Sequence, residues 1–186
     1  MTRSKRLFFA IAASAGAAMR IADWRDRYAH CDGNPVPPEN FHMTLAFIGE
    51  LHTSKIEILT QATDDLLARQ TMAGGPLTLD QTGYWSKPGI FWLGPTSWPD
   101  ALSALAQDLR SLVSASGGKR DRNPFQPHIT LFRRCNAPPS QPLSQPDIEF
   151  HLDHLALFES VQARQGVRYQ ALCEWSLGHF TGAELT

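Results

Sequence analysis

Hydrophobic positions at the start of the chain follow first the pattern of a strand and then that of a helix. Leu7 to Ala12 form a short apolar run, which is typical of a buried β-strand. From Ser14 the apolar residues recur at spacings of three and four, and they define one helical face: Ala17, Ile21, Trp24 and Tyr28. The basic start, the apolar run and the small residues after it also resemble a secretory signal sequence. We favour the strand, because a helix beginning near Ser14 would start inside the supposed cleavage region.

The rest of the chain alternates strands and helices and then continues in strands alone. A strand is predicted over 41–49, and a capping box at Ser54 and Glu57 begins a helix. The pattern further predicts strands over 77–84, 90–93 and 128–132, a helix over 99–116, and a C-terminal strand whose apolar residues alternate without a break over 167–177. Several strands thus follow one another without helical crossovers. This order favours an α+β fold in which antiparallel sheets carry helices on their outer faces.

The composition is that of an ordinary globular protein. The chain has 186 residues, of which 42% are hydrophobic and 19% charged, so we expect one domain over residues 1–186. The formal net charge of −1 provides no global excess of Lys and Arg, and any contact with nucleic acid should be local. Three cysteines without regular spacing predict reduced thiols in a cytoplasmic protein. No apolar run approaches the length that crosses a bilayer, so we expect no membrane association.

One short pattern occurs twice, as His42-Met43-Thr44-Leu45 and as His128-Ile129-Thr130-Leu131. One such pattern is expected by chance roughly 0.05 times in a chain of this composition, and two about a thousandth of the time. Both copies lie in predicted strands, where residues two apart face the same way. Each strand therefore presents an imidazole and a hydroxyl on one face and an apolar pair on the other. Two such strands facing one cleft would be related by approximate two-fold symmetry.

Two imidazoles and two hydroxyls suit the hydrolysis of a cyclic phosphate. The reaction is an in-line displacement at phosphorus, which needs a base on one side and an acid on the other. Histidine can serve as either near neutral pH. The hydroxyls of Thr44 and Thr130 can donate to the non-bridging oxygens, where negative charge develops. A lone histidine on a half-buried strand is more often structural, but the repeated pair favours catalysis.

The segments FHMTLAFIGE and FQPHITLFRR resemble the two signatures of the 2H phosphoesterase superfamily, in particular the bacterial RNA 2′,3′-cyclic phosphodiesterases, also called 2′–5′ RNA ligases. RLFFAI, GYW…IFWLG and LFES…RYQAL extend the likeness over nearly the whole chain. The resemblance implies a two-lobed fold around a central cleft, without metal or cofactor. It implies that His42 is the proton donor to the leaving 3′ oxygen, that His128 is the base for water, and that the two threonines hold the phosphate. The two motifs alone leave the assignment of acid and base open.

The resemblance also places a phosphate-binding arginine five residues after the second histidine, which is Arg133. Simple strand alternation would instead put Arg134 on the catalytic face, unless the strand bulges or ends there. We keep both as candidates and rank Arg133 first. One of the two is then a solvated surface charge.

Other residues offer weaker candidates. His52, His151 and His154 could be imagined as metal ligands, but residues three apart on a strand face opposite sides, so we expect no metal site. Three aromatic residues could stack on a terminal base, although core packing is the commoner use: Trp85, Phe132 and Tyr169. Three basic residues before the second motif could steer an RNA end, with a solvated loop as the plainer reading: Lys119, Arg120 and Arg122.

Three functional hypotheses follow. The first is a monomeric enzyme that hydrolyses 2′,3′-cyclic phosphate at RNA 3′ ends, with 2′–5′ ligation as its reverse reaction. ATP-driven ligation is not supported, because the chain has no Gly-rich phosphate loop and no dinucleotide fingerprint. The second keeps both histidines but acts on small cyclic nucleotides or cyclic ADP-ribose phosphate. The third is a non-catalytic RNA-binding module of the same fold, which would have no need of two imidazoles.

Overall fold

The computed structural model describes residues 4–69, 74–119, 121–164 and 166–178. Its elements follow in the order β1 (Ser4–Ala12), α1 (Ala15–Tyr28), β2 (Asn34–Pro35), the 3-10 turn η1 (Pro38–Asn40), β3 (His42–His52), the 3-10 turn η2 (Thr53–Lys55), α2 (Ile56–Arg69), β4 (Pro76–Leu79), β5 (Gln81–Trp85), β6 (Ile90–Gly94), α3 (Asp100–Ala115), β7 (Ile129–Arg133), β8 (Ile148–His151), β9 (His154–Ala163) and β10 (Gly166–Ser176). All pairings of the described strands are antiparallel. The predicted α+β class with antiparallel sheets is confirmed.

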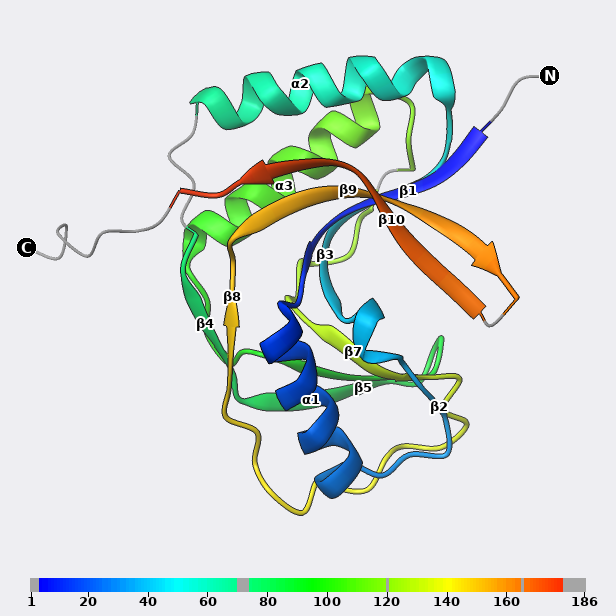
Figure 1. Cartoon of the computed structure of the whole chain (residues 1–186), viewed down its shortest axis with the longest axis vertical. Helices are drawn as coiled ribbons and strands as arrows, with labels where there is room; N and C mark the ends of the chain where they lie inside the picture. Colours follow the sequence, from blue (N-terminus) through cyan, green and yellow to red (C-terminus); the bar gives the residue numbers. More distant parts are fainter. Residues whose placement is uncertain (1–3, 70–73, 120, 165, 179–186) are drawn as a thin grey trace, which may run out of the picture.

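The main sheet consists of two halves that meet at a single pair of residues. Its strand order is β10-β9-β1-β3-β7-β6-β5, with β2 added beside β7. Within the described residues, β3 and β7 are joined only through Met43 and Ile129. Figure 1 shows α2 and α3 beside the half that contains β1, β3 and β9, and α1 beside the half that contains β5 and β7. The junction of the halves is therefore the place where the two repeated motifs come together.

The N-terminal strand and helix occur where the hydrophobic pattern places them. β1 pairs with β3 on one side and with β9 on the other, so it lies inside the sheet. α1 begins after Ser14, whose side-chain oxygen accepts a hydrogen bond from the backbone N–H of Ala17. The predicted inner face of this helix is buried at Ala17, Ile21 and Trp24.

Three predicted details are wrong. The strand expected over 77–84 divides at Asp80 into β4 and β5. The carboxylate of Asp80 accepts hydrogen bonds from the backbone N–H and the hydroxyl of Thr96 at this turn. The helix cap expected at Ser54 is replaced by a 3-10 turn, in which Nδ1 of His52 accepts from the Ser54 N–H. β10 carries a bulge, so its alternation is interrupted at Leu172.

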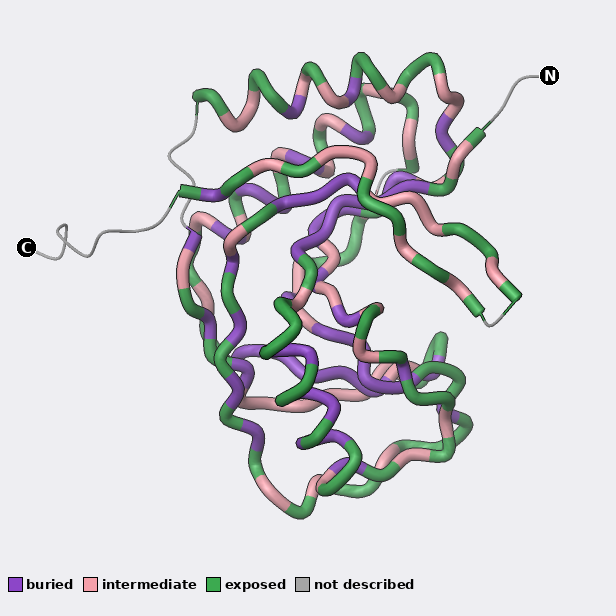
Figure 2. The backbone as a smooth tube through the Cα atoms, viewed as in Figure 1, coloured by how far each residue is buried: buried purple, intermediate pink, exposed green. Residues whose placement is uncertain are grey.

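One continuous cluster of buried side chains runs through both halves of the sheet. Figure 2 shows this burial along the inner strands and on the inward faces of the helices. α3 contributes Leu102, Leu105 and Leu109, each at most 2% exposed. Burying one such leucine stabilises the fold by about 2 kcal/mol. No helix among the described residues is long and apolar enough to span a membrane.

Candidate active site

The two repeated motifs lie side by side on one face of the sheet. Met43 and Ile129 are cross-strand partners, and both are fully buried. In an antiparallel pair, the residues before and after such partners point to the opposite face. Extending the register of this pair by one residue on each side brings four polar side chains together on that face, with His42 opposite Thr130 and Thr44 opposite His128; the effect of His128 on the pKa of His42 agrees with this arrangement. The two histidines are then diagonal neighbours, with Cα atoms about 7–8 Å apart.

Each imidazole is held by a hydrogen bond to the backbone two residues earlier. Nδ1 of His42 lies 2.7 Å from the carbonyl oxygen of Asn40, and Nδ1 of His128 lies 2.8 Å from that of Gln126. A carbonyl oxygen only accepts, so Nδ1 must carry the proton in both rings. Nε2 is then the atom that can accept a proton, and in the protonated ring it can donate one. The two motifs thus hold their histidines in the same way.

Aromatic rings enclose the outer side of each imidazole. Tyr169 of β10 meets His42 edge-on, with ring centroids 4.8 Å apart at 80°. Trp85 of β5 meets His128 in nearly the same geometry, at 4.6 Å and 79°. Phe8 lies 5.1 Å from His42 on a further side. These contacts fix the ring orientations, and they also remove water from around the rings.

Burial keeps both imidazoles neutral. It lowers the pKa of His42 from 6.5 to about 4, opposed by the hydrogen bond to Asn40 and assisted by the positive charge of Arg133 and by His128. Burial also lowers the pKa of His128, opposed by the hydrogen bond to Gln126 and assisted by Arg133. In the free protein near pH 7, both rings are therefore neutral bases.

Arg133, rather than Arg134, is the arginine whose charge acts on both histidines. The reason is a bulge in β7. Phe91 faces Phe132 and the next residue of β6 faces Thr130, so Leu131 is an extra residue in the strand. The bulge shifts the alternation by one and returns Arg133 to the side of the motif. β7 ends there, and Arg134 has a φ of 59° that turns the chain away.

A cleft of about 1020 Å³ opens beside His42. Its walls come from β1, the segment around β2, residue 119, residues 121–123, the end of β7 and the β9–β10 hairpin, which Figure 1 shows projecting toward the side of β2. Its charged lining residues in the described chain are five cations and one acid: Arg6, Lys119, Arg122, Arg133, Arg134 and Asp121. The acid is paired with Arg110 at 3.3 Å. The cleft is therefore strongly positive, although the chain as a whole carries a net charge of −1.

The weaker sequence candidates separate into two groups. Lys119 and Arg122 line the cleft, whereas Arg120 lies outside the described residues. Phe132 is 8% exposed and stacks on Phe91, so its proposed contact with a base is wrong, and it belongs to the core. Two of the candidate metal-binding histidines make separate local contacts.

Nδ1 of His52 lies 2.6 Å from the Ser54 hydroxyl, and Nε2 of His151 lies 2.8 Å from the Glu149 carboxylate.

Sequence reasoning missed Phe47, an aromatic residue of the cleft that is 56% exposed. Its place in an apolar-rich strand indicated a core residue. Only the position of the bulges and the strand pairing reveals that it faces the cleft.

The fold is that of a phosphoesterase. A solved phosphoesterase structure matches this chain with a TM-score of 0.85 at 35% identity, over 95% of this chain and all of that one (100%). The chain belongs to the 2′-5′ RNA ligase superfamily, whose family model matches residues 13–164. The family resemblance inferred from the sequence motifs is thereby confirmed.

Individual relatives agree. The RNA 2′,3′-cyclic phosphodiesterase of Escherichia coli K12 is 35% identical over 178 residues, which cover 95% of this chain and 99% of that protein. The structure of E. coli LigT complexed with 3′-AMP matches with a TM-score of 0.83 at 35% identity, over 94% of this chain and 99% of that one.

Proposed function

We propose that this protein is a hydrolase that opens 2′,3′-cyclic phosphate at RNA 3′ ends and leaves a 2′-phosphomonoester. The observation that carries the proposal is the pair of imidazoles, His42 and His128, which lie as diagonal neighbours with both Nδ1 atoms fixed. Their Nε2 atoms are the acid and base that an in-line displacement requires. The relatives named RNA 2′,3′-cyclic phosphodiesterase support this substrate.

In this mechanism, water attacks phosphorus while Nε2 of His128 accepts its proton. The bond between phosphorus and the 3′ oxygen breaks, and protonated His42 donates its Nε2 proton to that oxygen. The hydroxyls of Thr44 and Thr130 donate to the non-bridging oxygens, and Arg133 balances their charge. The assignment of acid and base follows the family resemblance, because the backbone holds both rings alike.

One imidazole must gain a proton before the reaction, although both are neutral in the free protein. The bound cyclic phosphate carries one negative charge, and an anion beside an imidazole favours its charged form. It also offsets the charge of Arg133, which lowers the pKa of both rings. We therefore expect proton uptake to accompany substrate binding.

The cleft favours an RNA strand over a free mononucleotide. Its volume of about 1020 Å³ is slightly above the roughly 300–1,000 Å³ of the pockets that enclose a small ligand. Arg6 and Arg122 also line the cleft, and they belong to segments other than β7. They can therefore contact further phosphates of an RNA strand. Phe47 and Tyr169 offer aromatic surfaces for bases. A small cyclic nucleotide or cyclic ADP-ribose phosphate would leave most of this lining unused.

Two further properties belong to the proposal. Both histidines come from one chain, so the site is complete in a monomer. Cys31, Cys135 and Cys173 are free thiols, which supports a reducing, cytoplasmic setting. A 2′–5′ ligation would be the reverse of ring opening, with a 5′-hydroxyl in place of water.

The test uses a short oligonucleotide that ends in a 2′,3′-cyclic phosphate, with chromatographic identification of the product. We expect a 2′-phosphate end, and we expect His42→Ala and His128→Ala each to lower turnover by at least about 10². His30→Ala is the matched control, because His30 is an exposed histidine outside the cleft. Circular dichroism checks the fold of each variant. Normal turnover in either motif variant, or a 3′-phosphate product, would contradict the mechanism.

A further inference from the structure

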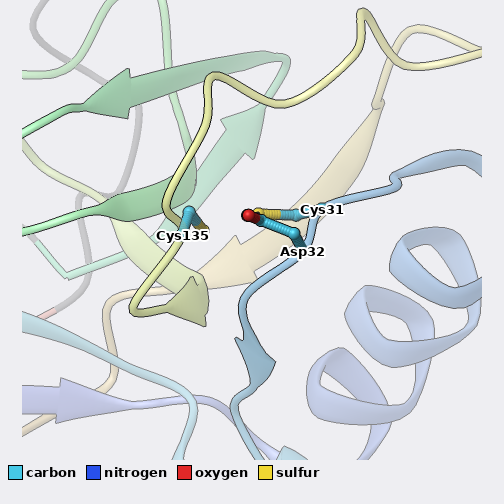
Figure 3. Close-up of side chains that lie close together, drawn as sticks. All are labelled: Cys31, Asp32 and Cys135. Atoms are coloured by element: carbon cyan, nitrogen blue, oxygen red, sulfur yellow. The ribbon is translucent and has the colours of Figure 1, made fainter.

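Two thiols and a carboxylate meet at the end of the β2–β7 pairing that lies beyond Arg133. Cys31 and Asp32 lie just before β2, and Cys135 lies just after β7. One ligand atom from each, the two Sγ atoms and a carboxylate oxygen, all lie within 4.8 Å of one another. Figure 3 shows the three side chains close together, between the segment that leads into β2 and the loop that leaves β7. It is the one described group of three His, Cys, Asp or Glu side chains at metal-ligand spacing.

The backbone around these side chains brings them together. Gly33 follows Asp32, and a β-carbon at position 33 would lie 2.7 Å from Sγ of Cys135. On the other side, the Cys135 N–H donates to the Gly89 carbonyl at 3.0 Å. The close approach of Cys135 therefore depends on a glycine at position 33, and it is not a chance contact of long side chains.

The carboxylate of Asp32 is also oriented. The backbone N–H of Asn136 donates to both of its oxygens, at 3.1 and 3.3 Å. The Gly33 N–H lies 3.4 Å from Sγ of Cys31 and donates to it. Such outer contacts are how proteins commonly orient the ligands of a metal ion.

The Asp32 carboxylate gives the group its negative charge, while the Cys135 thiol keeps its proton near pH 7 until a cation binds. Burial raises the pKa of the Cys135 thiol to about 11, and the hydrogen bond with Cys31 and the charges of Cys31 and Asp32 raise it further. No ion pair involves Asp32 among the residues that the structure describes. Tyr84, whose hydroxyl donates to the Cys135 carbonyl at 3.3 Å, adds no positive charge. A bound cation would supply the charge that this corner of the fold lacks.

We propose that Cys31, Asp32 and Cys135 bind a thiophilic divalent cation of the zinc class. Two thiolates and one carboxylate are ligands that zinc accepts, with water in the fourth position. Zn–S bonds of about 2.3 Å in a tetrahedral arrangement separate two sulfurs by roughly 3.8 Å, within the spacing found here. Both thiols lose their protons to the solvent as the metal binds, so affinity rises with pH.

The site is structural in its effect. The metal would join the segment before β2 to Cys135, which lies two residues beyond the end of β7 and one residue beyond Arg134. Arg133 and Arg134 both line the cleft, so the cross-link would stabilise the segment from which they project. None of the three ligands lines the cleft, and the proposed hydrolysis uses none of them. Chelation should therefore leave turnover unchanged at the assay temperature while it lowers the melting temperature.

The test titrates reduced, metal-free protein with Zn²⁺ by calorimetry and with Cd²⁺ by its thiolate charge-transfer absorption. We expect one equivalent to bind, with proton release. Cys31→Ser and Cys135→Ser should each weaken binding by at least about 100-fold, and Asp32→Asn by about 10–100-fold. Cys173→Ser is the matched control, because Cys173 belongs to β10, where its Sγ lies 3.8 Å from the Thr60 hydroxyl of α2, and it should not affect binding.

Each outcome decides the proposal. One equivalent that depends on Cys31 and Cys135 but not on Cys173 supports it. Absence of uptake, or uptake equal in all cysteine variants, overturns it. The proposal is also overturned if the reduced protein binds no metal but forms a Cys31–Cys135 disulfide when a disulfide oxidant is added. The two cysteines would then be a redox pair. Because the Asp32→Asn variant keeps shape and both thiols, it tests the site even where a cysteine variant fails to fold.

Discussion

The buried imidazole of His42 should make the stability of the folded protein depend on pH. Folding lowers the pKa of His42 from 6.5 to about 4, so the unfolded chain binds a proton more readily. The stability is fully present above pH 6.5, and it is lost progressively as the pH falls toward 4. Each pH unit between the two values is worth about 1.4 kcal/mol, which gives a loss of about 3 kcal/mol.

The variant His42→Gln removes this titration and keeps a polar side chain. Other groups that titrate between pH 4 and 7 are common to both proteins and cancel in the comparison. Loss of the hydrogen bond to Asn40 destabilises the variant by an amount that does not depend on pH. The free energy of unfolding of the wild type should therefore fall relative to that of the variant, by up to about 3 kcal/mol from pH 7 to pH 4.

Urea unfolding followed by tryptophan fluorescence measures both free energies at each pH. Arg134→Gln serves as the control, because its charge does not act on the pKa of His42, and it should follow the wild type. Parallel curves for the wild type and His42→Gln would refute the reasoning. They would mean that the imidazole is hydrated and titrates alike in the folded and unfolded chains.

Two further predictions concern the arginines of the cleft. Arg133→Gln removes a charge that lowers the pKa of both histidines, so the bell-shaped pH profile of kcat/KM should move to higher pH. Arg134→Gln should leave this profile in place. Equal profiles in the two variants would contradict the conclusion that Arg133 is the arginine whose charge acts on the histidines. Arg6→Gln and Arg122→Gln should weaken binding of a cyclic-phosphate oligonucleotide, and each should lessen its log–log salt slope by about 0.7. Neither should change the kinetics of a mononucleotide 2′,3′-cyclic phosphate, and an equal loss on both substrates would argue against an RNA-binding cleft.

The parts that the sequence predicted correctly are those decided by neighbours along the chain. The apolar alternation of His42 to Leu45 specifies a strand with one polar face, and the helix over α3 follows from leucines at helical spacing. The repetition of the motif indicated that both strands serve one site. The pairing of Met43 with Ile129, by contrast, depends on contacts between distant segments, and no local pattern contains it.

The bulges mark the limit of pattern reasoning. A single extra residue, Leu131, decides that Arg133 rather than Arg134 acts on the histidines, and Leu172 divides the apolar row of β10. On one side of that bulge Tyr169 contacts His42, and on the other Trp175 contacts Phe9 in the core. A bulge leaves the order of hydrophobic and polar residues unchanged, so only the pairing with the neighbouring strand reveals it.

The geometry of the site also depends on a residue outside both motifs. Among the described residues, β3 and β7 pair through Met43 and Ile129 alone, so packing must hold the histidines at their separation. Arg25 of α1 is 6% exposed, and its guanidinium lies 5.5 Å from the ring of Phe41 and 5.7 Å from that of Phe132. These rings immediately precede His42 and Arg133, so one buried cation contacts the chain just before a residue of the proposed site in each half. The motifs supply the chemistry, and packing beneath them determines whether the two imidazoles can act on one phosphate.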